Sequence, residues 1–166
     1  MQGRITLTTS RDPSQRTRSF AKVISRYMNW YYLQRGKQSL EDIFESHEKL
    51  IIIREIKGNP AFMDIYDGRR IVMSVRMNVG VIVKEKMDDS PVYFAGKPPF
   101  DPVILGALPK THAGERFALK LRPRKVVYVR RGGYLDFRYD GRRVLTLKLL
   151  RVYEGDDKAE GKKGLA

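Results

Sequence analysis

Hydroxyl and guanidinium side chains gather near the N-terminus, in the segment TTSRDPSQRTR at residues 8–18. The segment follows a short predicted strand at residues 4–8 and precedes a predicted helix, so these side chains lie where the helix begins. Free N–H groups and the positive dipole of a helix start attract phosphate, and arginines offer forked donors to phosphate oxygens. We therefore expect a phosphate site here. The alternative is that the hydroxyl groups only cap the helix while the arginines are solvated.

The helix that follows is expected to have two chemically different faces. We expect Asp12 as its N-cap, Pro13 at its first position and Gly36 at its end. Its apolar residues recur at helical spacing and form one stripe: Phe20, Val23, Ile24, Tyr27, Met28 and Tyr31. Three cations spaced four apart lie nearly opposite: Arg18, Lys22 and Arg26. One face should therefore pack into a core, and the other should present positive charge to solvent.

The net charge of +14 comes from two basic blocks of the sequence. Residues 1–35 contain seven Lys or Arg and one Asp, and residues 116–151 contain twelve Lys or Arg and two Asp. The segments between and after these blocks are close to neutral. An evenly solvated basic surface would not leave half the chain neutral, so this segregation favours a polyanionic partner, either nucleic acid or an acidic membrane surface.

The second block also carries aromatic residues between its cations, with Tyr128 and Tyr134 close to Arg130 and Arg131. Exposed aromatic rings between arginines can stack on the bases of single-stranded RNA. Tyrosine is equally an ordinary residue of strands, so burial in the core is the competing interpretation.

The usual groups of catalytic and metal sites are missing from the sequence. Cysteine is absent and two histidines occur, which excludes disulfides, thiolate nucleophiles and Cys/His zinc sites. His47 and His112 are isolated, and the motifs GxxxxGK[ST], GxGxxG and GxSxG do not occur. We therefore predict no catalytic residue, no bound metal and no cofactor. No apolar run reaches about 18 residues, so no membrane span is expected and the location should be cytoplasmic, or nucleolar in a eukaryote.

The remaining pattern predicts an α/β protein with mixed sheets. Ser39 should cap a short helix that ends near residue 46. Strands are expected at residues 50–56, 61–66, 70–75, 79–84, 116–121, 125–129, 134–139 and 143–152. The proline-rich residues 87–109 should form a connection, in which residues 102–108 could make a short helix.

The pentapeptide YDGRR occurs twice, at residues 66–70 and 139–143, each time between two predicted strands. Asp-Gly is a strong hairpin signal, so the repetition predicts an internal duplication. Chance recurrence of a common turn is the alternative. The duplication would divide the chain into an N-terminal half at residues 1–86, a C-terminal half at residues 87–155 and a short polar tail at residues 156–166.

Three segments resemble, in order and spacing, the Brix-domain family of ribosome biogenesis proteins: TTSRDPSQRTRSFAK, RGKQSLEDIFE and LIIIREIKGNPAFMDIYD. The resemblance is closest to the branch linked to a small nucleolar ribonucleoprotein that processes small-subunit pre-rRNA. It implies that residues 1–166 form a single Brix domain, whose two halves are each similar to the anticodon-binding domain of class IIa aminoacyl-tRNA synthetases. It also implies binding of ribosomal RNA precursors without catalysis by the protein itself.

Residues and resemblance together predict a monomeric rRNA-binding biogenesis factor that acts in pre-rRNA processing and small-subunit assembly. Its expected partners are ribosomal RNA or pre-rRNA and other pre-ribosomal proteins, with no membrane. The expected RNA contacts are Thr9, Ser10, Arg11, Ser14, Arg16, Arg18, Lys22 and Arg26 from the first block, and Arg122, Arg124, Lys125, Arg130 and Arg131 from the second. The alternative function is a protein-interaction module that docks an acidic partner in a pre-ribosomal particle.

Overall fold

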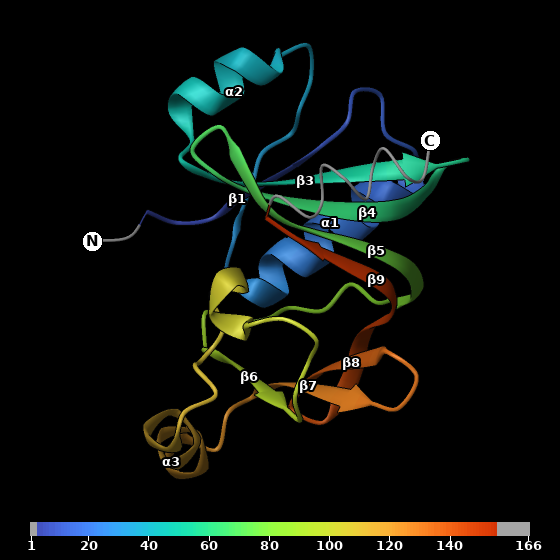
Figure 1. The fold of residues 1–166 in the computed structure, drawn as a ribbon. Coiled ribbons are helices and arrows are strands. Elements are labelled where there is room, and N and C mark those ends of the chain that lie inside the picture. The colour runs from blue at the N-terminus through green and yellow to red at the C-terminus, as the bar shows by residue number, and fades with distance from the viewer. Residues whose placement is uncertain (1–2, 156–166) are drawn as a thin grey trace.

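The computed structural model describes residues 3–155, which form one nine-stranded mixed sheet with helices on its two faces (Figure 1). The expected tail at residues 156–166 lies outside the described residues. The elements in chain order are β1 (Thr6–Thr9), α1 (Gln15–Met28), β2 (Tyr31–Tyr32), α2 (Leu40–Ser46), β3 (Lys49–Ile56), β4 (Asn59–Asp67), β5 (Arg70–Ile82), β6 (Val92–Ala95), the 3-10 helix η1 (Pro102–Leu105), α3 (His112–Leu121), β7 (Lys125–Arg130), β8 (Tyr134–Tyr139) and β9 (Arg142–Glu154). The expectation of an α/β fold with a mixed sheet is confirmed.

The strand order across the sheet is β2-β1-β3-β4-β5-β9-β8-β7-β6. β1 runs parallel to β2 and β3, and β6 runs parallel to β7, whereas the other neighbours are antiparallel. From the central pair β5–β9, the order outward begins in the same way in both directions, with two antiparallel steps and then a parallel strand; the N-terminal end has one further parallel strand, β2. The two sides meet through the long β5–β9 ladder, which crosses the middle of Figure 1.

Helix α1 begins two residues later than the sequence suggests. Ser14 has extended backbone angles and its side chain accepts the N–H of Thr17, so Ser14 is the N-cap. Asp12, the expected cap, has φ +50°, which belongs to a turn before the helix. The helix ends at Asn29 rather than Gly36, because Asn29 adopts the left-handed conformation and its N–H bonds to the carbonyl of Ser25.

The buried stripe of α1 is confirmed for five of its six expected members. Phe20, Val23, Ile24, Tyr27 and Met28 are all at most 5% exposed and belong to the main core. Tyr31 lies beyond the helix in β2 and is 46% exposed. In Figure 1, α1 passes behind the sheet, and strand residues that alternate toward it complete the core. The smaller α2 packs Ile43 against Leu50 and Ile52, whose neighbours in β3, Ile51 and Ile53, belong to the main core, so α2 covers the other face of the N-terminal strands.

The C-terminal part contains one wrong assignment and one element that the sequence did not reveal. Residues 116–121, expected as a strand, belong to helix α3, which Thr111 caps through the N–H of Gly114. The alternation of Phe117, Leu119 and Leu121 imitated a strand, but these three side chains are 49–78% exposed on the helix. β6 falls within the proline-rich connection, and the expected short helix at residue 102 is η1.

Both copies of YDGRR form hairpin turns, as expected, but in different registers. Asp67 pairs with Arg70 in the first, so Gly68 and Arg69 form the loop. In the second, Tyr139 pairs with Arg142, and the loop residues Asp140 and Gly141 have φ values of +50° and +81°. Two positive φ values are the mark of a type I′ turn. The same five residues therefore form turns with two different geometries. In each hairpin, a β-bulge lies in the strand before the turn, near Ile65 in the first and near Phe137 in the second.

Candidate nucleic-acid interface

The start of α1 is already occupied by a carboxylate from the protein itself. Oε2 of Glu55, near the end of β3, accepts the backbone N–H of Ser14 at 3.2 Å and the hydroxyl of Thr17. The hydroxyl of Ser14 donates to the carbonyl of Gly58 at 2.6 Å. The Thr17 hydrogen bond, with those from Ser14, lowers the pKa of Glu55 against the opposing effect of burial, so the carboxylate stays ionised. Ser14, expected to contact phosphate, is therefore a capping residue in contact with an internal anion.

Of the two hydroxyl residues before this cap, Thr9 is turned inward and Ser10 is half-buried. Thr9 is 1% exposed and its hydroxyl donates to the carbonyl of Ser10 at 2.8 Å, so the expectation that Thr9 contacts RNA is wrong for its side chain. Ser10 is half-buried and donates its backbone N–H to Ile53. The hydroxyl cluster thus fixes the junction between β1 and α1 and does not form a free phosphate cradle.

A polar hollow of about 170 Å³ opens beside this junction. Its lining comes from the end of β1, the start of α1 and the segment after β2: Thr9, Asp12, Pro13, Arg18, Tyr32, Gln34, Arg35, Gly36 and Lys37. Arg35 is 7% exposed and donates to the carbonyls of Thr9 at 3.0 Å and Gln38 at 2.8 Å. Within residues 3–155, no carboxylate lies within ion-pair distance of Arg35.

The electrostatics of this hollow are dominated by that buried guanidinium. Burial, and then the positive charge of nearby Arg11, lower the pKa of Arg35. A buried cation without a counter-charge is costly, and Arg18 and Lys37 add positive charge to the same hollow. Asp12 is the one carboxylate among the lining residues. The hollow therefore has the charge and the donors to accept an oxyanion such as a phosphate group.

The four cations expected on α1 differ in how freely they face solvent. Arg18 and Lys22 are exposed and have no acidic partner in the part of the chain that the structure describes. Arg16 is exposed, but its Nη2 donates to the carbonyls of Val79 and Gly80 at the end of β5. Arg26 is paired with Asp89 at 3.0 Å and also donates to the carbonyl of Met87. Of the two free cations, Arg18 also lines the hollow.

Lys125, expected in the RNA-binding set, is wholly buried. It is 0% exposed, and its Nζ donates to Asn29 Oδ1 at 2.8 Å and to the carbonyl of Asp88. Burial lowers its pKa from 10.5 to about 8. The expectation that Lys125 contacts RNA is wrong, because β7 turns this side chain into the interface with the C-terminal end of α1.

The four remaining cations expected from the second block divide into two that form ion pairs and two that do not. Arg124 is paired with Asp88 at 2.6 Å and Asp140 at 2.7 Å, and Arg130 is paired with the buried Asp136 at 3.2 Å. Arg122 and Arg131 are exposed without an acidic partner among residues 3–155. Leu135 and Phe137 of β8 point into the core beside α1, so Asp136 and its arginines lie on the opposite face of the sheet. The expected contacts therefore do not form one surface but are divided between two sides of the sheet.

Three residues of this site were missed in the sequence. Arg35 and Lys37 flank Gly36, which was interpreted as the end of a long helix, and no pattern distinguishes a buried arginine from an exposed one in a loop. Glu55 was missed because its partners, Ser14 and Thr17, are about forty residues away in sequence. Only the pairing of β1 with β3 brings them together.

Among residues 3–155, no group of three or more His, Asp or Glu side chains is placed so that it could hold a metal ion. His47 Nδ1 lies 3.1 Å from the hydroxyl of Thr6, and the ring stacks near Tyr31. In the same part of the chain, no helix is long and apolar enough to cross a membrane.

Comparison with known proteins gives a consistent set of relatives, although no family model matches the chain. The chain is 44% identical over 146 residues to a probable Brix domain-containing ribosomal biogenesis protein of Archaeoglobus fulgidus, covering 88% of this chain and 95% of that protein. A protein of the same description from Methanothermobacter thermautotrophicus is 50% identical over 64 residues, covering 38% of this chain and 41% of that one.

Solved structures share the fold. The crystal structure of Mil, an archaeal Imp4-like protein, matches with a TM-score of 0.72 and 25% identity, covering 91% of this chain and 99% of Mil. A probable ribosomal biogenesis protein from Aeropyrum pernix matches with a TM-score of 0.57 and 20% identity, covering 93% and 98% of the two chains.

Proposed function

Because this chain belongs to the Brix-domain family of ribosome biogenesis proteins and is an archaeal Imp4-like homologue, we propose that it binds ribosomal RNA or its precursor during small-subunit assembly and pre-rRNA processing. In this proposal the protein holds RNA and catalyses no reaction itself. RNA phosphates contact the exposed cations around the start of α1, and the polar hollow beside Arg35 accepts one of them.

The observation that carries the proposal is the buried, carboxylate-free guanidinium of Arg35. Arg35 lines the hollow, and the other charged side chains of its lining are Arg18, Lys37 and Asp12. Arginine forks fit phosphate oxygens well, and a phosphate would supply the counter-charge that the protein does not provide. Arg11, near enough to lower the pKa of Arg35, extends the same positive region.

A salt titration with matched variants tests this assignment. Arg18→Gln combined with Lys37→Gln removes two cations that line the hollow, whereas Arg26→Gln removes an α1 cation already paired with Asp89. Each phosphate contact steepens the fall of log K with log salt by about 0.7 for single-stranded RNA. We expect the double variant, which loses the one phosphate held at the hollow, to lower the slope by about 0.7 and the control to change it much less, as measured by fluorescence anisotropy with a pre-rRNA fragment.

One result of this titration would contradict the assignment. If the slope of the double variant equals that of the unmodified chain, phosphates do not bind at the hollow. The thermal midpoints should stay within a few degrees of one another, since all three substituted side chains are exposed.

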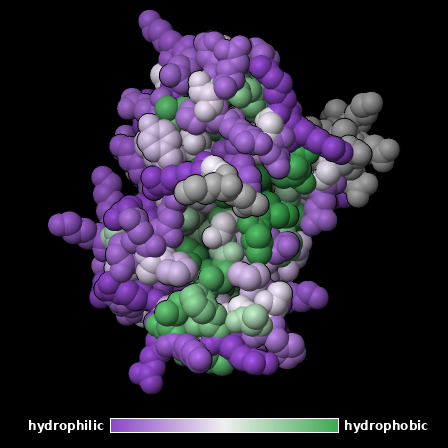
Figure 2. All heavy atoms as spheres, turned by 90° about the vertical axis from the view of Figure 1, so that its left-hand side faces the viewer, coloured by the Kyte–Doolittle hydropathy of each residue, from purple (hydrophilic) through white to green (hydrophobic). Residues whose placement is uncertain are grey.

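A second candidate function is protein docking within a pre-ribosomal particle, and α3 favours it. Phe117, Leu119 and Leu121 are 51%, 78% and 49% exposed on this helix. Figure 2 shows hydrophobic residues in a band that runs from the middle of this face to its lower end, and that lower end is at the height of α3 in Figure 1. This candidate predicts a different result in the same titration: no RNA binding at low salt by the isolated chain, together with copurification of one acidic protein.

We further propose that the two halves, residues 1–86 and 87–155, arose by duplication of a unit similar to the anticodon-binding domain of class IIa aminoacyl-tRNA synthetases. The matching strand order on both sides of the β5–β9 pair supports this. Two buried aspartates, one in each half, support it as well. Asp64 of β4 and Asp136 of β8 are 2% and 3% exposed at their side chains, and each is paired with arginine.

A further inference from the structure

The face of the sheet turned away from α1 carries exposed tyrosines between cations over β7, β8 and β9. Alternation along β8 places Tyr134 and Asp136 on this side, because Leu135 and Phe137 are in the core. The strand register puts Tyr128 opposite Asp136, and aligns Arg130, Tyr134 and Lys148 across three strands. We call this group the open face: Tyr128, Arg130, Tyr134, Asp136, Arg138, Arg143 and Lys148.

One buried carboxylate organises the cations of the open face. Asp136 accepts hydrogen bonds from Arg130 at 3.2 Å, Arg138 at 3.0 Å and Arg143 at 3.1 and 3.2 Å. Burial alone would raise its pKa, but the hydrogen bonds from the three arginines outweigh that effect and lower it. Three guanidinium groups around one ionised carboxylate leave a local excess of two positive charges. Their side chains remain 30–54% exposed, so donors are left for an external anion.

The tyrosines lie among these cations with their rings accessible. Tyr128 is 37% exposed and Tyr134 is 47% exposed. The Arg130 guanidinium lies 5.5 Å from the centre of the Tyr128 ring, and Lys148 Nζ lies 5.3 Å from the centre of the Tyr134 ring. A cation at this distance is attracted to the face of the ring. The rings therefore lie accessible at the surface beside exposed cations.

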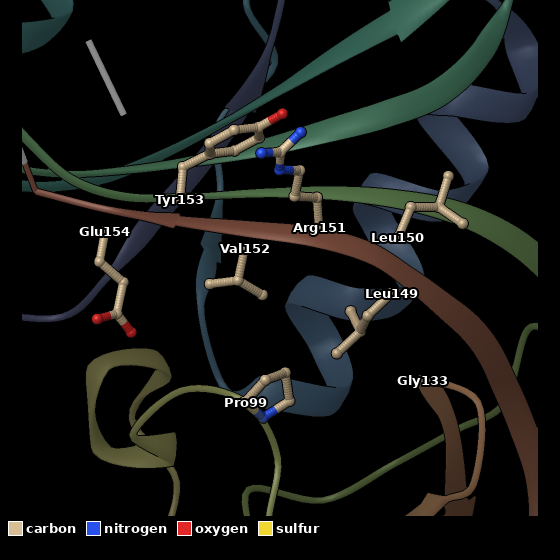
Figure 3. Close-up of a pocket in the computed structure, with 8 residues that line it drawn as sticks. All are labelled: Pro99, Gly133, Leu149, Leu150, Arg151, Val152, Tyr153 and Glu154. Atoms are coloured by element: carbon tan, nitrogen blue, oxygen red, sulfur yellow. The ribbon is translucent and has the colours of Figure 1, made fainter. Parts of the chain in front are cut away.

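The same side of the sheet continues toward the N-terminal half. Figure 3 shows Arg151 and Tyr153 projecting from one side of β9 and Val152 from the other, toward Pro99. Arg151 of β9 lies opposite Arg76 of β5 in the strand register. The guanidinium carbon of Arg76 lies 5.7 Å from the centre of the Phe62 ring in β4. Basic and aromatic side chains therefore alternate from β7 through β9 to β4. The hollow of about 610 Å³ seen in Figure 3 lies along β9 itself and has no such group of cations.

We propose that the open face binds single-stranded RNA, with bases stacked on Tyr128 and Tyr134 and phosphates held by the arginines around Asp136. This inference rests on the proposed function and adds a second surface on the other side of the sheet from α1. Stacking on aromatic side chains requires unpaired bases, because a duplex hides its base faces. The open face therefore distinguishes single strands from duplexes, which the cations of α1 need not do.

Binding of a labelled 12-nucleotide RNA and of the matching duplex, each measured by fluorescence anisotropy on the full chain, tests the inference. We expect Tyr128→Leu combined with Tyr134→Leu to weaken single-strand binding by about tenfold or more, since stacking contributes substantially per base. Duplex binding and the salt slope should be nearly unchanged. Tyr128→Phe combined with Tyr134→Phe should restore single-strand binding, because the rings remain.

Tyr31→Leu is the matched control, since Tyr31 is also exposed, at 46%, but lies at the far edge of the sheet. Two results would overturn the inference: single-strand affinity of the double leucine variant equal to that of the unmodified chain, or an equal loss in the phenylalanine variant. If the unmodified chain binds neither RNA, the proposed function fails as well. If it binds RNA but the leucine variant behaves identically, only the open-face site fails.

Discussion

Single residues in this protein connect elements that are far apart in the sequence, and Lys125 is the clearest case. Its ammonium group bonds to Asn29, which ends α1, and to the carbonyl of Asp88 in the connection between β5 and β6. Asn29 in turn donates to the carbonyl of Ser90 at 2.9 Å. One buried cation thus joins the end of the long helix, the connection and β7 in a single polar cluster.

The lowered pKa of Lys125 makes stability depend on pH. With a pKa near 8 in the folded state and 10.5 when unfolded, the unfolded chain binds more protons between these values. The free energy of unfolding should therefore rise with pH across this window, by at most about 3 kcal/mol. Lys125→Met should remove that rise, as measured by chemical denaturation from pH 7 to 10. Equal pH slopes for the two proteins would contradict this prediction.

Above about pH 10 another buried group acts in the opposite direction. Burial raises the pKa of Tyr27, whose hydroxyl donates to the carbonyl of Arg138 at 2.9 Å. The unfolded chain then loses this proton first, so stability falls as the pH rises further. The Lys125 comparison is therefore best confined to pH values below 10.

The sequence predicted the chemistry of these residues better than their exposure. Arg18 and Lys22 were correctly placed on the solvent face because helical spacing fixes the face of each residue. Lys125 was expected at the surface and Arg35 was missed, because burial of a long cation depends on partners that other elements bring: Asn29 for Lys125 and the end of β1 for Arg35. Local spacing contains no information about such partners.

At the scale of elements, the sequence located nearly all strands but failed where packing is slight. β3, β4, β7, β8 and β9 were expected within a few residues of their ends, because their buried apolar residues are easy to recognise. β5 was expected as two strands, at residues 70–75 and 79–84, but is one strand, Arg70–Ile82. α3 was taken for a strand: its apolar residues alternate by two, while only Gly114 and Ala118 are buried. Two residues give no helical stripe to recognise, although Glu, Ala, Leu and Lys in this segment are good helix formers.

The turn between β7 and β8 allows a test of backbone constraint with a matched pair. Gly132 and Gly133 both have φ +82°, a conformation that L-residues rarely adopt. A Cβ at Gly133 would lie 2.6 Å from the carbonyl oxygen of Leu149, whereas at Gly132 it would meet only the Tyr134 ring at 3.4 Å. Gly133→Ala should therefore lower the free energy of unfolding more than Gly132→Ala does, by about 1 kcal/mol or more. Chemical denaturation of the two variants measures this difference. Equal losses would show that backbone conformation alone sets the cost.

At the scale of the whole molecule, the N-terminal and C-terminal parts of the sheet share one core. Tyr27 of α1 contacts Phe137 of β8 edge to face, with ring centres 5.2 Å apart. Trp30 is 4% exposed, and its Nε1 donates to the carbonyl of Leu105 at 2.9 Å. The repeat of YDGRR indicated two related parts, but nothing in it indicated that α1 would pack across both.

This shared core predicts cooperative unfolding. Trp30 is the single tryptophan of the chain and lies where the two parts meet, so its fluorescence reports on their contact, whereas far-ultraviolet circular dichroism reports on all helices and strands. The two thermal transitions should coincide within about 2 °C, as two-state unfolding requires. A fluorescence change well below the main dichroism transition would show that the parts separate before they unfold.

The ends of the sheet have a consequence for the crowded surroundings of a growing particle. β2 contains two residues and β6 contains four, and these are the outermost strands in the sheet order. A long free edge would offer unpaired N–H and C=O groups on which another polypeptide could assemble as an added strand. Here both edge strands are too short to offer many such groups. The sheet therefore gives newly made chains around it little template for aggregation, although part of the face turned away from α1 stays exposed.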